Sequence, residues 1–65
     1  MLKLKAERTK RGWSQTRLSV LTGIAQSDLS AIENGHKRVG AGWRRRLADV
    51  FGMAEADLFA EESGR

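Results

Sequence analysis

The sequence predicts an all-α fold, and three observations support this prediction. Residues 14–35 form two short amphipathic segments with a Gly-Ile turn between them. Apolar side chains of residues 41–51 recur at i, i+4, i+7 and i+8, the spacing of one helix face, as Trp43, Leu47, Val50 and Phe51. The chain contains no proline, the residue that most disrupts a helix interior. Its 65 residues allow one domain with a small core.

The first part of the chain predicts two helices. Residues 2–10 carry helix formers and make the first. Ser14 can N-cap the second by accepting a hydrogen bond from an otherwise unpaired backbone N–H. Trp13 and Leu18 stand at the two positions of a hydrophobic staple, which would fix the angle at which the chain enters that helix. Gly23 then supplies a tight turn, because glycine tolerates left-handed backbone angles.

A third helix follows this turn and ends at Asn34-Gly35, where Gly35 is placed just past the last helical residue. Two helices joined by a tight glycine turn make a helix-turn-helix, whose second helix can lie in the DNA major groove. Two more helices are expected, at about 41–51, ended by Gly52, and at about 54–59.

The third predicted helix has an apolar face and a polar face. One side carries Ala25, Leu29 and Ile32, and the opposite side carries Gln26, Ser30 and Asn34, with Ser27 beside them. The apolar side suits a core. Glutamine can make a bidentate contact to N6 and N7 of adenine, and serine can donate to or accept from several base edges. Any solvent-facing helix can have this composition, but here a glycine-turn helix precedes it and a basic loop follows it.

Charge is distributed unevenly along the chain. Residues 1–46 contain 11 Lys or Arg against 3 Asp or Glu, a net charge of +8, whereas residues 47–65 have a net charge of −4. Such a field attracts DNA and orients its approach. The run His36-Lys37-Arg38 is well placed for phosphate because it directly follows the third helix. Of Arg44-Arg45-Arg46, one or two can touch phosphate, since three successive side chains cannot face one way on a helix.

Several classes of protein are excluded or disfavoured. Without cysteine there are no disulfides, no cysteine-based zinc fingers and no thiol chemistry. The single His36 has neither triad partners nor companion metal ligands, so no enzyme, cofactor or metal site is expected. No apolar run approaches membrane-spanning length, and the first residues lack the apolar core of a signal peptide. We therefore expect a cytoplasmic protein that contacts no membrane and takes no small-molecule ligand.

The chain resembles the Cro/C1-type (lambda-repressor-like, XRE) helix-turn-helix family from about Leu4 to Phe59. The most specific parts of the resemblance stand together in register: Arg8, Trp13-Ser14-Gln15, Leu18, Gly23-Ile24, Leu29, Ile32-Glu33-Asn34-Gly35, Ala48 and Phe51-Gly52. The resemblance implies a compact five-helix bundle that binds operator DNA, usually as a dimer. We expect this DNA-binding domain to span residues 1–60 and residues 61–65 to form a flexible tail.

The resemblance also implies roles for individual residues. Positions that match the base-reading side of the recognition helix, about residues 25–33, are Gln26, Ser27, Ser30 and Ala31. Positions that match phosphate contacts are Gln15, placed to brace Gln26, then Asn34, the Gly35 backbone and Lys37. Arg8 and Glu33 match an ion pair that ties the first helix to the third. If this pair is buried, loss of one partner costs about 3–5 kcal/mol.

Three positions depart from the family pattern. Ala25 stands where Ser or Thr is usual, so the recognition helix lacks a side-chain N-cap worth about 1 kcal/mol. Arg17 replaces the Glu of a capping box, and its charge is unfavourable near a helix N-terminus unless it reaches a phosphate. Asp28 can favour the helix dipole, accept from a cytosine amino group or repel the DNA backbone, and we favour the first.

These features predict a sequence-specific transcriptional regulator, a repressor that binds a palindromic operator as a homodimer. Met53 and Phe59 either close the core or form a self-complementary dimer patch. Leu58 belongs in the core, and Val20 should be exposed. The alternative is an antitoxin-type or other protein-interaction module of the same fold, with incidental DNA binding. An exposed patch of Val20, Met53 or Phe59 would favour that alternative.

Overall fold

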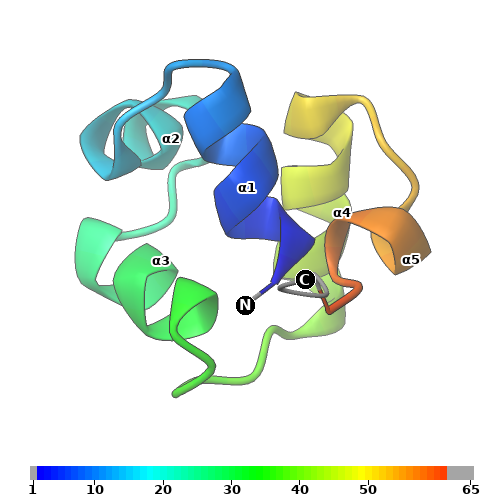
Figure 1. Cartoon of the computed structure of the whole chain (residues 1–65). Helices are drawn as coiled ribbons and strands as arrows, with labels where there is room; N and C mark the ends of the chain where they lie inside the picture. Colours follow the sequence, from blue (N-terminus) through cyan, green and yellow to red (C-terminus); the bar gives the residue numbers. More distant parts are fainter. Residues whose placement is uncertain (1, 62–65) are drawn as a thin grey trace.

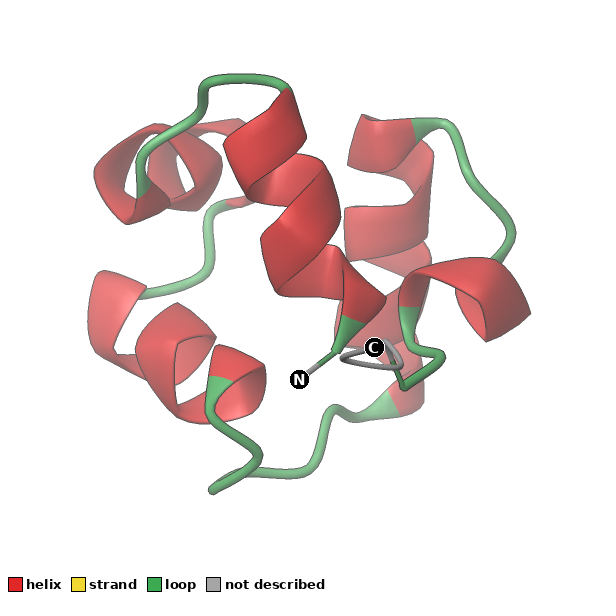
Figure 2. Ribbon diagram, in the orientation of Figure 1, coloured by secondary structure: helices red, strands yellow, loops and turns green. Residues whose placement is uncertain are grey.

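The computed structural model describes residues 2–61, and within them five α-helices follow one another. They are α1 (Lys3–Lys10), α2 (Gln15–Thr22), α3 (Gln26–Glu33), α4 (Ala41–Phe51) and α5 (Glu55–Leu58) (Figures 1 and 2). The described chain contains no strand, only an isolated antiparallel bridge between Leu2 and Glu61. The predicted all-α fold is confirmed. Of the expected tail, Glu61 takes part in this bridge, and residues 62–65 lie outside the described part.

Helix α1 runs between the two halves of the bundle, with α2 and α3 on one side and α4 and α5 on the other (Figure 1). Helix α2 packs against both α3 and α4, and α5 packs against α1 and α4. The radius of gyration is 10.6 Å, against about 10.7 Å expected for a compact chain of this length. The helix-turn-helix is therefore supported by α4, which packs on α2, and α5 supports α1 and α4 in turn.

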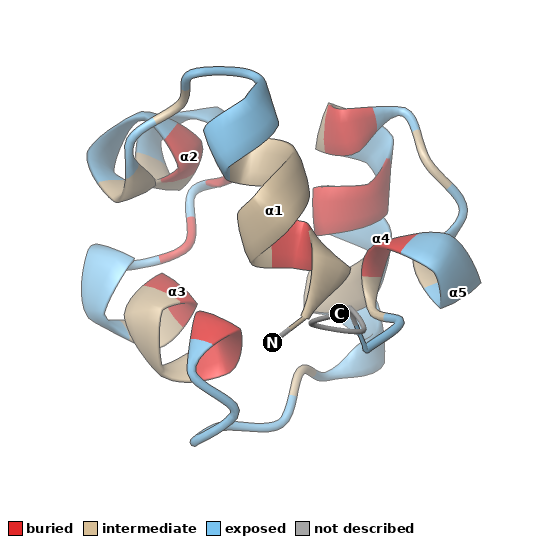
Figure 3. Ribbon diagram, viewed as in Figure 1, coloured by how far each residue is buried: buried red, intermediate tan, exposed pale blue. Residues whose placement is uncertain are grey.

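The core is made of aliphatic side chains from every helix and one phenylalanine. Its buried residues are Leu4, Leu18, Ile24, Leu29, Ile32, Leu47, Ala48, Phe51 and Leu58 (Figure 3). Leu58 is fully buried as predicted, and Trp43 is half-buried against the core. The expectation for Ala25 was wrong, because this residue is exposed. Ala25 is the N-cap residue with a non-helical ψ of 142°, so its side chain does not follow the helical spacing that grouped it with Leu29 and Ile32.

Hydrogen bonds define both ends of α2, the first helix of the motif. The Ser14 Oγ accepts from the Arg17 N–H at 3.0 Å, as the N-cap prediction required. Gly23 takes a left-handed φ of 73°, and its N–H donates to the Ser19 carbonyl at 2.7 Å. This αL cap reverses the chain within a few residues and sends it into α3.

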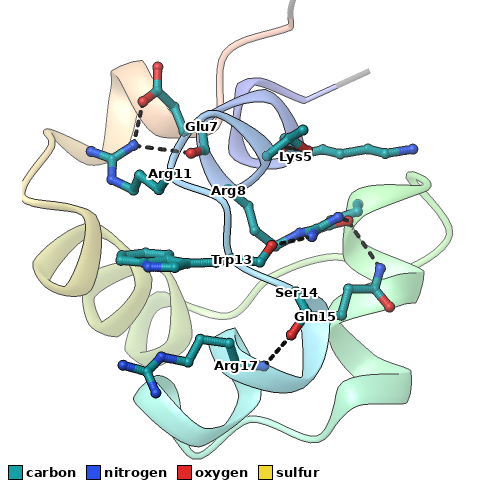
Figure 4. A network of polar contacts seen from close by, with 10 residues as sticks. Lys5, Glu7, Arg8, Arg11, Trp13, Ser14, Gln15 and Arg17 are labelled. Atoms are coloured by element: carbon teal, nitrogen blue, oxygen red, sulfur yellow. Dashed lines mark hydrogen bonds and ion pairs between the residues drawn. The ribbon is translucent and has the colours of Figure 1, made fainter.

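A buried carboxylate joins α3 to the rest of the motif. Glu33, whose side chain is 1% exposed, accepts from the Arg8 guanidinium at 2.7 and 3.1 Å. A third Arg8 nitrogen donates to the Trp13 carbonyl at 2.7 Å, and the Gln15 amide donates to the same carboxylate at 3.1 Å (Figure 4). The expected ion pair between Arg8 and Glu33 is thus present. It links α1, α2, α3 and the loop after α1.

Two further arginines hold α4, Arg11 against the end of α1 and Arg46 against α2. The Arg11 guanidinium lies over the rings of Trp13 and Phe51, at 5.7 and 4.9 Å from their centroids, and donates to the Phe51 carbonyl at 3.0 Å. Arg46 donates to the Thr22 carbonyl at 3.2 Å. Because that carbonyl belongs to the last residue of α2, Arg46 satisfies an acceptor at the helix end that α2 itself leaves unpaired.

We predict that Glu33→Gln lowers the free energy of unfolding by about 3 kcal/mol, near the lower bound for breaking a buried pair. The lower bound applies because the Arg8 side chain is 13% exposed, so water can solvate the abandoned guanidinium. Urea denaturation followed by circular dichroism measures this loss. Asp49→Asn on the exposed side of α4 is the matched control and should shift stability by no more than about 0.5 kcal/mol. Equal effects of the two variants would contradict the structural role of Glu33.

Candidate nucleic-acid interface

The outer face of α3 presents short polar side chains to solvent. Gln26 and Ser27 are exposed, and Ser30 and Ala31 are partly exposed one turn later. Leu29, Ile32 and Glu33 point the other way and are buried. The structure therefore leaves the four predicted base-reading residues accessible on one helix, which is the geometry that a major groove can accommodate.

Gln26 is held by a residue that the sequence analysis did not single out. The Thr16 hydroxyl donates to the Gln26 Oε1 at 3.1 Å, from α2 to α3. The Gln15 amide, expected to brace Gln26, donates to Glu33 instead. Thr16 lies ten residues earlier in the chain, and only the crossing of α2 over α3 brings the two side chains together. The Thr16 bond leaves one Oε1 lone pair and both amide hydrogens of Gln26 for a base edge.

The start of α3 carries no side-chain cap. Ala25 occupies the N-cap position with φ −58° and ψ 142°, and it accepts no side-chain hydrogen bond. Asp28 stands in the first turn, where its negative charge favours the helix dipole. These observations agree with two of the three departures noted in the sequence, those at Ala25 and Asp28.

The loop after α3 differs from the expected phosphate grip in one respect. The Gly35 N–H donates to the Ile32 carbonyl at 3.1 Å, and the His36 N–H donates to the Ala31 carbonyl at 2.8 Å. With Gly35 at a φ of 77°, these bonds form a Schellman motif. The Gly35 backbone was predicted to bind phosphate, but its N–H is engaged in closing α3. In the described chain the N–H groups of Lys37 and Arg38 have no acceptor.

The predicted phosphate-binding side chains fall into two groups. Asn34, Arg17 and Arg38 are exposed, and none of their side chains bonds to a residue in 2–61. Figure 4 shows Arg17 extending away from the molecule. The Gln15 amide and the Lys37 ammonium, by contrast, already contact carboxylates, Glu33 and Asp28 respectively. The first group is thus the one that a phosphate can reach without displacing a partner.

The three consecutive arginines of α4 have different surroundings. Arg44 lies over the Phe59 ring at 4.6 Å and 3.4 Å from a Glu55 oxygen, and Arg46 bonds to the end of α2. Arg45 is exposed, with no partner in the described chain. As expected for successive helical positions, they do not act as one patch, and Arg45 is the one free to meet an anion.

The residues considered for a dimer patch pack partly against their own core. Met53 and Phe59 are half-buried there. The exposed large apolar side chains of residues 2–61 lie instead on α2, where Val20 is 74% exposed and Leu21 39%. Val20 was predicted to be exposed, whereas Leu21 was missed.

Fold and surface together define a helix-turn-helix domain with its second helix open to solvent. A family model described as a helix-turn-helix domain matches residues 2–61. The chain therefore belongs to a helix-turn-helix family, consistent with the Cro/C1-type resemblance, and this fold indicates a DNA-binding protein. No curated protein and no solved structure matches the chain. Over residues 2–61 there is no helix of the length and apolar character needed to cross a membrane.

We predict that Ala25→Thr stabilises the domain by about 0.5–1 kcal/mol, because the hydroxyl supplies the missing N-cap of α3. The exposed position and extended backbone of Ala25 accept such a side chain. Ala25→Val is the matched control, since valine has the shape of threonine without the hydroxyl. Urea unfolding compares the two variants. Equal stability of the Thr and Val variants would show that the α3 N-terminus gains nothing from a cap.

Proposed function

We propose that this protein is a sequence-specific transcriptional regulator, a cytoplasmic repressor that binds a two-fold-related operator as a homodimer. One observation carries the proposal: an exposed polar face on α3, with Gln26 already oriented by Thr16, lies within a family-matched helix-turn-helix. In such proteins the second helix enters the major groove, and dimers place half-sites about 34 Å apart. Neither catalysis nor a cofactor has a part in this proposal.

In the proposed complex Gln26, Ser27, Ser30 and Ala31 read base edges. Arg38 in the loop after α3 binds phosphate together with Asn34, as does Arg17 on α2, and Lys37 adds a weaker contact because it is paired with Asp28. Gln15 can still offer its second amide hydrogen to phosphate while the first bonds to Glu33. Gly35 serves by shaping the loop, and Met53 and Phe59 form the dimer contact.

The direct test of this function is in-vitro selection from random duplex DNA. We expect an enriched palindrome with half-sites about one helical turn apart, because two copies related by a two-fold axis read the same sequence on opposite strands. Duplex binding without any enriched sequence would overturn sequence-specific recognition. Enrichment of a single, non-repeated half-site would overturn the dimer.

Gln26→Ala should weaken operator binding by about 1–3 kcal/mol and relax the preference at one base pair, because a base contact is lost. Arg38→Ala should weaken binding to all sequences alike and reduce the slope of affinity against salt concentration, because a phosphate contact is lost. Fluorescence anisotropy on operator and on random duplex separates the two effects. If Gln26→Ala lowers the affinity for operator and for random duplex equally, Gln26 does not contact a base.

A protein-interaction role is the second candidate, and two surface features favour it. Val20 and Leu21 expose apolar surface on α2. A groove of about 690 Å³, lined by Lys5, Arg38, Phe59 and neighbours, adjoins the loop after α3. A protein seated there would cover Arg38 and compete with DNA. Strong salt-dependent DNA binding, with no partner recovered in pull-downs, would count against this role.

A further inference from the structure

The recognition helix carries two acidic side chains: Glu33 is buried, and Asp28 lies at the surface beside a lysine expected to bind phosphate. The Lys37 Nζ is 3.7 Å from the Asp28 Oδ1 and 6.0 Å from the Trp43 ring centroid. The Lys37 side chain thus turns back from the loop toward the first turn of α3. Side-chain exposures of 45% for Lys37 and 34% for Asp28 leave both charges at the protein surface.

We propose that Asp28 masks Lys37 and so lowers the sequence-independent part of DNA binding. This inference rests on the proposed function of α3. A phosphate can use Lys37 only by drawing it away from Asp28, which then faces the DNA as an unpaired negative charge. If the pair stays intact, Lys37 neutralises no phosphate. Either way, Lys37 contributes less than the full counterion release of one cation.

Arg38 provides the comparison within the same loop. It is the next residue, it is exposed, and its guanidinium has no partner within residues 2–61. Its whole charge is therefore available to a phosphate. Two adjacent cations should consequently make unequal contributions to DNA affinity, although the sequence gives both the same apparent role.

The masking matters because exposed ion pairs are weak. A phosphate can therefore still draw Lys37 away, so Asp28 reduces the affinity for any duplex without abolishing the contact. The affinity that is lost comes from phosphate contacts, which carry no sequence information. The base contacts expected of Gln26 and Ser27 do not change. Binding then depends more on base contacts than the charge of the loop would suggest.

The test measures binding to a random-sequence duplex by fluorescence anisotropy at several salt concentrations. It compares the wild type with Asp28→Asn, Lys37→Gln and the double variant. Asp49→Asn controls for the change in net charge, because Asp49 is an exposed carboxylate on α4 with no partner in residues 2–61. Circular dichroism checks that each variant keeps its helices, and Asp28→Ser serves as a second variant at the same position.

Asp28→Asn should tighten binding about five-fold and steepen the salt slope by about 0.9, well beyond the effect of Asp49→Asn. Lys37→Gln should change the salt slope little in the wild type. In the Asp28→Asn background it should reduce the magnitude of that slope by about 0.9. Equal effects of Lys37→Gln in both backgrounds, or of Asp28→Asn and Asp49→Asn, would overturn the masking. If neither the wild type nor Asp28→Asn binds duplex DNA, the proposed function fails as well.

Discussion

The buried carboxylate of Glu33 is the interaction on which the motif depends. It lies at the end of α3 and is contacted by Arg8 of α1 and Gln15 of α2, while Arg8 also holds the loop at Trp13. An ionised carboxylate can remain buried only when its oxygens are paired and hydrogen-bonded. The bonds that Arg8 and Gln15 make to Glu33 fix α1, α2 and α3 relative to one another. The need to pair one buried carboxylate therefore sets the orientation of α3.

The arginines of this basic chain fall into two groups, one that bonds within the fold and one that remains exposed. Arg8, Arg11 and Arg46 satisfy carboxylates, carbonyls or aromatic faces inside the fold. Arg17 on α2 and Arg38 in the loop after α3 remain exposed, with no partner in the described residues. A core of nine apolar residues, one of them a phenylalanine, would be a modest scaffold alone, and hydrogen bonds from Arg8, Arg11 and Arg46 connect the helices in addition. The polar side chains of α3 and the exposed arginines are then not needed to hold the fold together and remain available to a ligand.

Much of the architecture was predictable because it rests on local physics. Helix periodicity, the Ser14 cap and the left-handed turn at Gly23 act within a few residues, and each lies where the sequence predicted it. The Arg8 and Glu33 pair was predictable only through a family resemblance. Nothing local marks two residues 25 positions apart as partners.

The sequence by itself determined an all-α chain, the position of the helix-turn-helix and the polar character of α3, since these follow from spacing and residue type. Only the tertiary structure decided which side chains meet. It placed Thr16 rather than Gln15 on Gln26, and it set Asp28 beside Lys37. Such pairings depend on how helices cross and loops fold back, and distances between segments far apart in the chain are not encoded in any local pattern.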